Sequence, residues 1–253
     1  MAIYNFARTA DDLADEGDAC AEARLADLAL YRRDLQAVSR GEAPGLRWRP
    51  VFEALALQLQ RRQLPTALLH QLLDAFEQDV DNPQYPDRQA LLDYCARSAN
   101  PIGRLLLHLY GVVDARSLQQ SDAICSALQL INFWQDLSRD GPRGRCYVTQ
   151  ADLQAHGFTA QRLASTEDNE HSKRLVRDLV DWAQSLMQQG APLATRIPGR
   201  AGWELRLVVQ GGLRILEKIR AMDHAVLKRR PQITALDAPL MLWRALRMRV
   251  APP

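Results

Sequence analysis

Apolar side chains recur every three or four residues along most of the chain, which is the spacing that gives an α-helix one buried face. Nine long segments follow this pattern: 3–15, 19–38, 51–62, 66–80, 87–110, 117–139, 167–189, 201–229 and 240–250. A pair of short helices is expected between residues 149 and 163, and Gly211 and Gly212 permit tight helix packing. No strand-like alternation of useful length occurs. The sequence therefore predicts an all-α fold of nine or ten helices, packed as a single domain over residues 1–253.

Proline residues mark where several of these helices begin or break. Pro50 and Pro65 each stand where proline suits the first turn of a helix. The pair Asn100 and Pro101 interrupts the segment 87–110, because proline lacks an amide donor and clashes with the preceding turn. We interpret this break either as a structural joint or as a kink that shapes a cavity.

Composition narrows the class of protein. The chain has 253 residues, 47% of them hydrophobic, which is enough for one sizeable core. With 32 Lys and Arg against 30 Asp and Glu, the net charge of +2 gives no bulk attraction to nucleic acid. Basic residues gather at Arg47, Arg49, Arg61 and Arg62, from Lys218 to Arg230, and at Arg244, Arg247 and Arg249. We interpret these clusters as solvated helix faces. The alternative is a weakly basic surface that rests on anionic lipid.

The cysteines and the hydropathy of the chain indicate the cellular compartment of the protein. The four cysteines, Cys20, Cys95, Cys125 and Cys146, form no Cys-x-x-Cys pair, so we expect reduced and mostly buried thiols of a cytoplasmic protein. No apolar run approaches the ~20 residues that span a bilayer. The sequence thus predicts a soluble protein, or one that is peripheral at the inner membrane surface.

One polar row stands out within the segment 117–139 and its end. Gln129, Asn132, Asp136 and Asp140 recur every three or four residues, so they share one helix face. Two carboxylates about 6 Å apart repel by roughly 2.8 kcal/mol at an effective dielectric near 20, and a divalent cation reverses that cost.

A second acidic turn lies near the start of the chain. Asp11 and Asp15 are again one helical turn apart, while Asp12 is either a third ligand or a solvated neighbour. A lone acidic turn is common on solvent faces, but two of them on one chain favour a shared site. The five histidines are isolated and show no metal-binding pattern.

Carboxylates from two helices suit the binding of Mg²⁺ against a diphosphate, because this hard cation takes carboxylate, water and phosphate oxygens. When a carbon–oxygen bond to diphosphate breaks, the negative charge that grows on the leaving group needs cations nearby. Arg8 and Arg145 are placed beside the two acidic turns to supply them. Tyr4 and Tyr147 could add hydrogen bonds.

These stretches resemble the two aspartate-rich motifs of the squalene/phytoene synthases. The first is Tyr4 to Asp15, reading YNFARTADDLAD, and the second runs from Gln129 to Tyr147, where QLINFWQDLSRD precedes GRCY. The resemblance covers nearly the whole chain. It implies an all-α isoprenoid (terpenoid) synthase fold that binds a prenyl diphosphate.

The resemblance also assigns roles to individual residues. It implies a Mg²⁺ cluster held by Asp11, Asp15, Asp136 and Asp140 with help from Asn132. Gln129, Arg8, Arg145 and Tyr147 would then line the diphosphate end.

The segment Tyr94 to Leu107 is similar to the branch found in bacterial hopanoid pathways, which converts presqualene diphosphate to hydroxysqualene. Ala96 stands where squalene and phytoene synthases tend to carry Tyr, and Asn100 with Pro101 replaces small residues. Asn100 either positions water beside the cation or caps the broken helix. The alternative reaction joins two farnesyl diphosphates head to head, giving presqualene diphosphate or squalene, and other hopanoid-pathway enzymes are candidate partners.

The family carries a segment ahead of the first motif, whereas this sequence begins almost at the motif. On that basis we expect an N-terminally shortened form of the fold. A rival interpretation from another class is a non-catalytic helical scaffold that keeps the fold. It predicts no Mg²⁺-dependent release of pyrophosphate.

Overall fold

The computed structural model describes residues 1–165 and 167–248, and in these ranges it contains helices and no strand. The all-α prediction is therefore confirmed. The chain divides into two compact units, one formed by residues 1–83 and 96–113 and the other by residues 84–95 and from 114 onward. The single-domain prediction stays a prediction.

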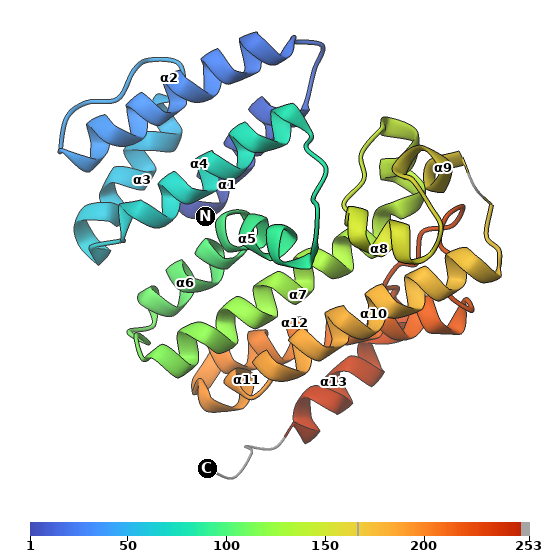
Figure 1. Cartoon of the computed structure of the whole chain (residues 1–253). Coiled ribbons are helices and arrows are strands. Elements are labelled where there is room, and N and C mark those ends of the chain that lie inside the picture. Colours follow the sequence, from blue (N-terminus) through green and yellow to red (C-terminus); the bar gives the residue numbers. More distant parts are fainter. Residues whose placement is uncertain (166, 249–253) are drawn as a thin grey trace. The chain divides into compact units, whose positions relative to one another are not determined.

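Five helices build the first unit (Figure 1): α1 (Ala2–Asp15), α2 (Ala21–Ser39), α3 (Arg49–Arg62), α4 (Thr66–Asp81) and α6 (Asn100–Leu109). Helix α1 packs against α2, α3 and α4, because Phe6, Ala10 and Ala14 recur at helical spacing and are all buried. The rings of Phe6 and Tyr31 lie 5.3 Å apart, and the Tyr31 hydroxyl donates a hydrogen bond to the Phe6 carbonyl at 3.1 Å. The buried side of α1 is thus fixed, which turns its acidic side outward from this core.

The second unit is built on a 26-residue helix. Its helices are α7 (Ala115–Asp140), η1 (Gly141–Arg143), α8 (Gln150–Ala155), α9 (Ala160–Ser165), α10 (Glu170–Gly190), α11 (Leu193–Arg196), α12 (Gly199–Ala221), η2 (Ala235–Asp237) and α13 (Ala238–Arg247). Helix α5 (Arg88–Ser98) runs across the boundary between the units. Helix α10 packs along α7, α12 packs on both, and α13 packs on α12. The Asp114 side chain caps α7 by accepting a hydrogen bond from the Ser117 amide, which sets where that helix begins.

Several local predictions need correction. The helix predicted for 201–229 ends at Ala221, because Asp223 and His224 both take left-handed backbone conformations, with φ of 52° and 61°. Pro50 lies in the first turn of α3 as predicted, whereas Pro65 is the residue that precedes α4. The segment 190–200, which lies between two predicted helices, contains the short helix α11.

The cysteines and the last helix also differ in part from what the sequence predicts. Cys20 is exposed, so the expectation of mostly buried cysteines does not hold for it, and all four cysteines are free thiols. The predicted helix 240–250 ends at Arg247, and Arg249 and Val250 lie outside the described residues. Among the helices of the described ranges, none combines the length and the apolar character needed to cross a bilayer.

Candidate functional site

The first acidic turn lies on α1, where Asp11 is partly buried and Asp15 exposed. Arg8 lies on the same helix and donates to the Asp11 carboxylate at 3.0 Å and to Glu16 at 2.6 Å, with Asp12 at 2.7 Å. The Asp12 carboxylate, the largest of these influences, raises the pKa of Arg8. The guanidinium that we predicted to face a diphosphate is therefore neutralised by acids of its own helix. Tyr4, one turn earlier, is 64% exposed.

The second acidic turn ends α7. Gln129, Asn132, Asp136 and Asp140 all lie on this one continuous helix, so the shared face that the spacing predicted is present. Asn132 is exposed and the other three are partly buried. Four polar side chains along the end of one helix form a row of hard oxygen and amide ligands.

Arg230 forms an ion pair with Asp136, and sequence reasoning did not single out this residue. Its Nε donates to one carboxylate oxygen, and its Nη2 donates to the other at 3.3 Å. Both side chains are about three-quarters buried. Because the two residues are 94 positions apart and Arg230 lies in a loop, no periodic pattern could have paired them. The guanidinium of Arg230 thus pairs with Asp136, a carboxylate that we predicted to be a metal ligand.

The electrostatics of Asp140 fit the same interpretation. Burial, and then the charge of Asp136 one turn away, raise the pKa of Asp140 to about 6. Arg143, Arg139 and Arg230 act in the opposite direction but do not cancel this rise. A carboxylate in such surroundings gains from a nearby divalent cation, which would favour its ionised form.

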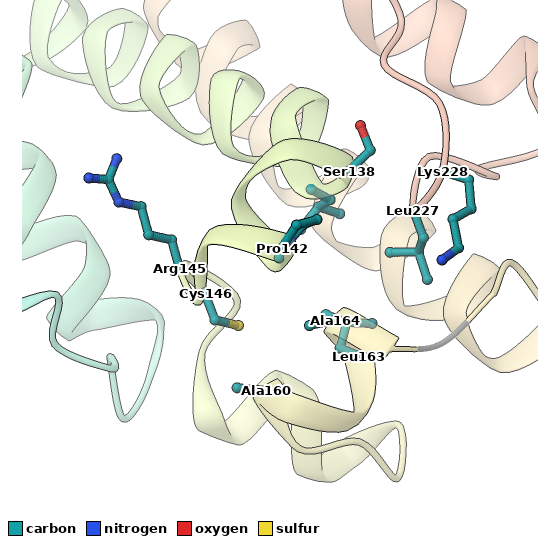
Figure 2. Close-up of a pocket in the computed structure, with 11 residues that line it drawn as sticks. Ser138, Pro142, Arg145, Cys146, Ala160, Leu163, Ala164, Leu227 and Lys228 are labelled. Carbon is teal, nitrogen blue, oxygen red and sulfur yellow. The ribbon is translucent and has the colours of Figure 1, made fainter. Parts of the chain in front are cut away.

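Arg145 and Cys146 follow η1 and line a small cavity of about 120 Å³ in the second unit. Figure 2 shows the Arg145 guanidinium extending away from the other lining residues, while Cys146 points toward Ala160 and Ala164 of α9. Burial raises the pKa of the Cys146 thiol, so the thiol is a packing group here rather than a nucleophile.

Tyr147 is held by stacking. Its ring lies parallel to that of Phe133 on α7, with centroids 3.7 Å apart and an angle of 6° between the planes. Tyr85 and Tyr94 complete the aromatic cluster, each with its ring centroid 6.3 Å from that of Tyr147. The segment after η1 is thereby fixed against α7, which positions Arg145 two residues earlier.

A larger hollow of about 330 Å³ opens between α7 and α12 in the second unit. Asn132, Arg230 and Gln232 supply polar groups to it, and Leu128, Ile131 and Ile233 supply apolar ones. This mixed lining places the Asn132 amide of the acidic motif, and the Arg230 guanidinium that pairs with Asp136, beside an apolar surface within one unit.

Asn100 is the first residue of α6 and is 8% exposed. The residue at the capping position is Ala99, and no side chain caps this helix. Asn100 therefore does not occupy the N-cap position of α6, and its predicted role beside the reacting cation stays a prediction.

The carboxylates proposed to bind a divalent cation form two pairs, one on α1 and one on α7. Across the described residues, no group of three or more His, Cys, Asp or Glu side chains is arranged to hold one metal ion. The motifs supply one carboxylate pair on α1 and one on α7, each with the one-turn spacing that brings two oxygen donors together. On α7 the pair has the oxygen donors that suit Mg²⁺, and Asp140, whose pKa is raised by burial and then by the charge of Asp136, would gain from a bound cation.

Comparison with known proteins gives consistent matches. A profile described as squalene/phytoene synthase matches residues 1–237. The chain is 32% identical to a hydroxysqualene synthase of Rhodopseudomonas palustris over 225 residues, which cover 88% of this chain and 74% of that one. It is 35% identical to a presqualene diphosphate synthase of the same organism over 159 residues, covering 62% of this chain and 55% of that one.

Among solved structures, the chain is similar to squalene synthase HpnC from Alicyclobacillus acidocaldarius. The TM-score is 0.81 at 35% identity, and the match covers 88% of this chain and 82% of that one. The predicted isoprenoid synthase fold is thereby confirmed.

Proposed function

The chain belongs to the squalene/phytoene synthase family, and we propose that it converts presqualene diphosphate to hydroxysqualene, with release of diphosphate, in a Mg²⁺-dependent reaction. The proposal is supported by the hydroxysqualene synthases among its relatives, in R. palustris, Sinorhizobium fredii and Zymomonas mobilis. The observation that carries it is the acidic row on α7, where Asp136 and Asp140 lie one turn apart and burial, followed by the charge of Asp136, raises the pKa of Asp140.

The reaction replaces the diphosphate of the substrate by a hydroxyl group, and the carbon skeleton of the cation rearranges between these two events. The carbon–oxygen bond to diphosphate breaks heterolytically and its electron pair leaves with the diphosphate. Water then attacks the rearranged carbocation and loses a proton to give the alcohol. Mg²⁺, when bound, would neutralise charge on the diphosphate.

The chain's own residues have separate tasks in this proposal. Asp136 and Asp140, with Asn132, would hold the metal from α7, and Asp11 and Asp15 would hold it from α1. A second set, Arg8, Gln129, Arg145, Tyr4 and Tyr147, would bind and orient the diphosphate. Because Arg230 contacts Asp136, it must shift or share that carboxylate when a metal binds.

Incubation with presqualene diphosphate and Mg²⁺, followed by mass spectrometry of the organic extract, tests the proposal. We expect hydroxysqualene and one pyrophosphate per turnover, with no nicotinamide required. Absence of pyrophosphate release would favour the non-catalytic scaffold instead.

A second candidate is the head-to-head condensation of two farnesyl diphosphates, supported by the presqualene diphosphate synthase similarity. It predicts product from farnesyl diphosphate alone, so parallel incubations with the two substrates separate the candidates. In either case the enzyme would act in isoprenoid biosynthesis, at the cytoplasmic side of the membrane that receives its lipid product. Other hopanoid-pathway enzymes would be its partners.

We also propose that Asn100 positions the attacking water. It is buried and polar, and it begins α6 at the break that follows α5. Replacing Asn100 by Ala should raise the proportion of hydrocarbon over alcohol in the product. An unchanged ratio would dispose of this role.

A further inference from the structure

In the part of the chain that the structure describes, helix α13 contacts the second unit through one of its sides. Asp237, directly before it, is buried and forms ion pairs with Arg214 and Lys218 of α12 at 2.7 and 2.6 Å. Arg244 pairs with Glu217 of α12, and Ala245 is fully buried. These contacts determine which face of α13 is covered by protein.

The other side of α13 carries a second apolar row. Pro239, Leu242, Trp243 and Leu246 follow the i, i+3, i+4, i+7 spacing that places side chains on one helix face. Trp243 is 50% exposed and Leu246 is 64% exposed. Leu236, just before the helix, is also exposed. A single exposed leucine is ordinary, but a row of four large or rigid apolar residues on one short helix marks a binding surface.

The charges beside this row favour an anionic partner. Helix α13 contains two arginines and no acidic residue. The exposed Arg247 lies over the Trp243 ring, with its guanidinium carbon 4.4 Å from the ring centroid. No carboxylate of the described residues pairs with Arg247. A tryptophan with an arginine along it is suited to the headgroup level of a bilayer, where the ring is half-immersed and the guanidinium meets phosphate.

The dimensions of the row favour a lipid surface over a second copy of this chain. Ten helical residues extend about 15 Å, too short to cross a bilayer but long enough to lie in its surface. A stable protein interface uses roughly 20–30 residues on each side. We propose that α13 docks the protein on an anionic membrane surface through Leu242, Trp243 and Leu246, with Arg247 at the phosphates. This inference rests on α13 alone and does not depend on the proposed reaction.

Co-sedimentation of the full chain with vesicles tests it. Vesicles of phosphatidylglycerol and phosphatidylcholine are compared with vesicles of phosphatidylcholine alone, at low and high salt. Leu242→Glu is the test variant, and Leu57→Glu on α3 is its matched control, because the two leucines are 49% and 51% exposed. We expect the wild-type protein to bind the anionic vesicles and Leu242→Glu to bind them about tenfold more weakly or worse. Leu57→Glu should bind as the wild type does.

Arg247→Gln isolates the charge contribution. It should weaken binding to the anionic vesicles by about fivefold and should reduce its salt dependence. Three results would overturn the proposal: equal losses in Leu242→Glu and Leu57→Glu, equal wild-type binding to neutral and anionic vesicles, or no vesicle binding. In the last case, light scattering that shows a wild-type dimer dissociated by Leu242→Glu would assign this face to a second copy of the chain.

Discussion

The ion pair between Asp136 and Arg230 is the most informative contact at the scale of single residues. Arg230 donates hydrogen bonds to both Asp136 oxygens, which we propose as ligands of a metal ion. These hydrogen bonds must change when a metal ion binds. An arginine can neutralise one carboxylate without offering a coordination site. The metal-free protein thus avoids part of the repulsion between Asp136 and Asp140.

Replacing Arg230 by Gln should free Asp136 for metal. Because a partly buried ion pair must be broken before the cation binds, we expect Mn²⁺ to bind about fivefold more tightly in the variant. Titration by electron paramagnetic resonance, without diphosphate, measures this directly. Arg229→Gln serves as the control, since Arg229 is an exposed neighbour. Weaker or unchanged Mn²⁺ affinity in Arg230→Gln would show that Arg230 does not compete with metal.

Asp140 gives a prediction about stability. Its pKa is raised to about 6 from an ordinary value of 3.8, so the folded protein binds a proton more readily than the unfolded chain does. The contribution to stability is complete below pH 4 and is lost as the pH rises through 6. Asp140→Asn should therefore stabilise the metal-free protein at pH 7.5 by roughly 1–2 kcal/mol, since solvent partly screens this half-buried group. Denaturant unfolding at pH 7.5 and pH 4 measures the difference, which should be several times smaller at the lower pH.

His224 should make stability depend on pH in the opposite sense. The ring is 8% exposed, and burial, followed by Arg177 and Arg220, lowers its pKa below 6.5. The unfolded chain then takes up the proton first, so the free energy of unfolding should fall as the pH drops below about 6.5. Replacing His224 by Gln should flatten this dependence in thermal unfolding between pH 5 and 8. The exposed His171→Gln should not, and equal profiles for the two variants would contradict the assignment.

At the scale of helices, the periodic pattern located most elements, because the buried faces of α1, α4, α7 and α10 are regular. The pattern did not locate the end of α12, because the backbone conformation determines where that helix ends. The apolar residues Ala225, Val226 and Leu227 continue the spacing beyond α12, but Asp223 and His224 turn the chain out of the helix. Left-handed residues other than glycine leave no mark in a hydrophobic pattern.

The adjacent glycines of α12, Gly211 and Gly212, differ in how much space there is for a side chain. A Cβ on Gly212 would lie 2.8 Å from the Met187 terminal carbon and 3.1 Å from Leu128, whereas a Cβ on Gly211 would meet nothing closer than 3.5 Å. Gly212→Ala should therefore destabilise the protein by roughly 1–3 kcal/mol. Gly211→Ala should be neutral or stabilising by up to about 1 kcal/mol, since alanine favours helix. Urea unfolding of both variants checks the contrast, and similar values would show that the packing at Gly212 relaxes freely.

For the whole molecule, the sequence indicated the fold class and both acidic turns, because helical spacing alone places those residues on shared faces. It could not indicate Arg230 or the stacking of Tyr147 on Phe133, which depend on tertiary contacts between segments of irregular spacing. The apolar row of α13 was readable in the sequence only as a helix. Its exposure became evident from which face α12 covers.

We propose that the carboxylate pairs of α1 and α7 act on the same metal–diphosphate complex. The most direct measurement is the binding of Mn²⁺ in the presence of inorganic pyrophosphate, followed by electron paramagnetic resonance, for Asp15→Asn, Asp136→Asn and the double variant. Asp18→Asn, an exposed neighbour of the first motif, is the control. The account predicts that each single variant weakens binding at least about tenfold and that the double variant loses much less than the product of the two. Binding that is unchanged in Asp15→Asn, or losses that simply multiply, would contradict a shared site.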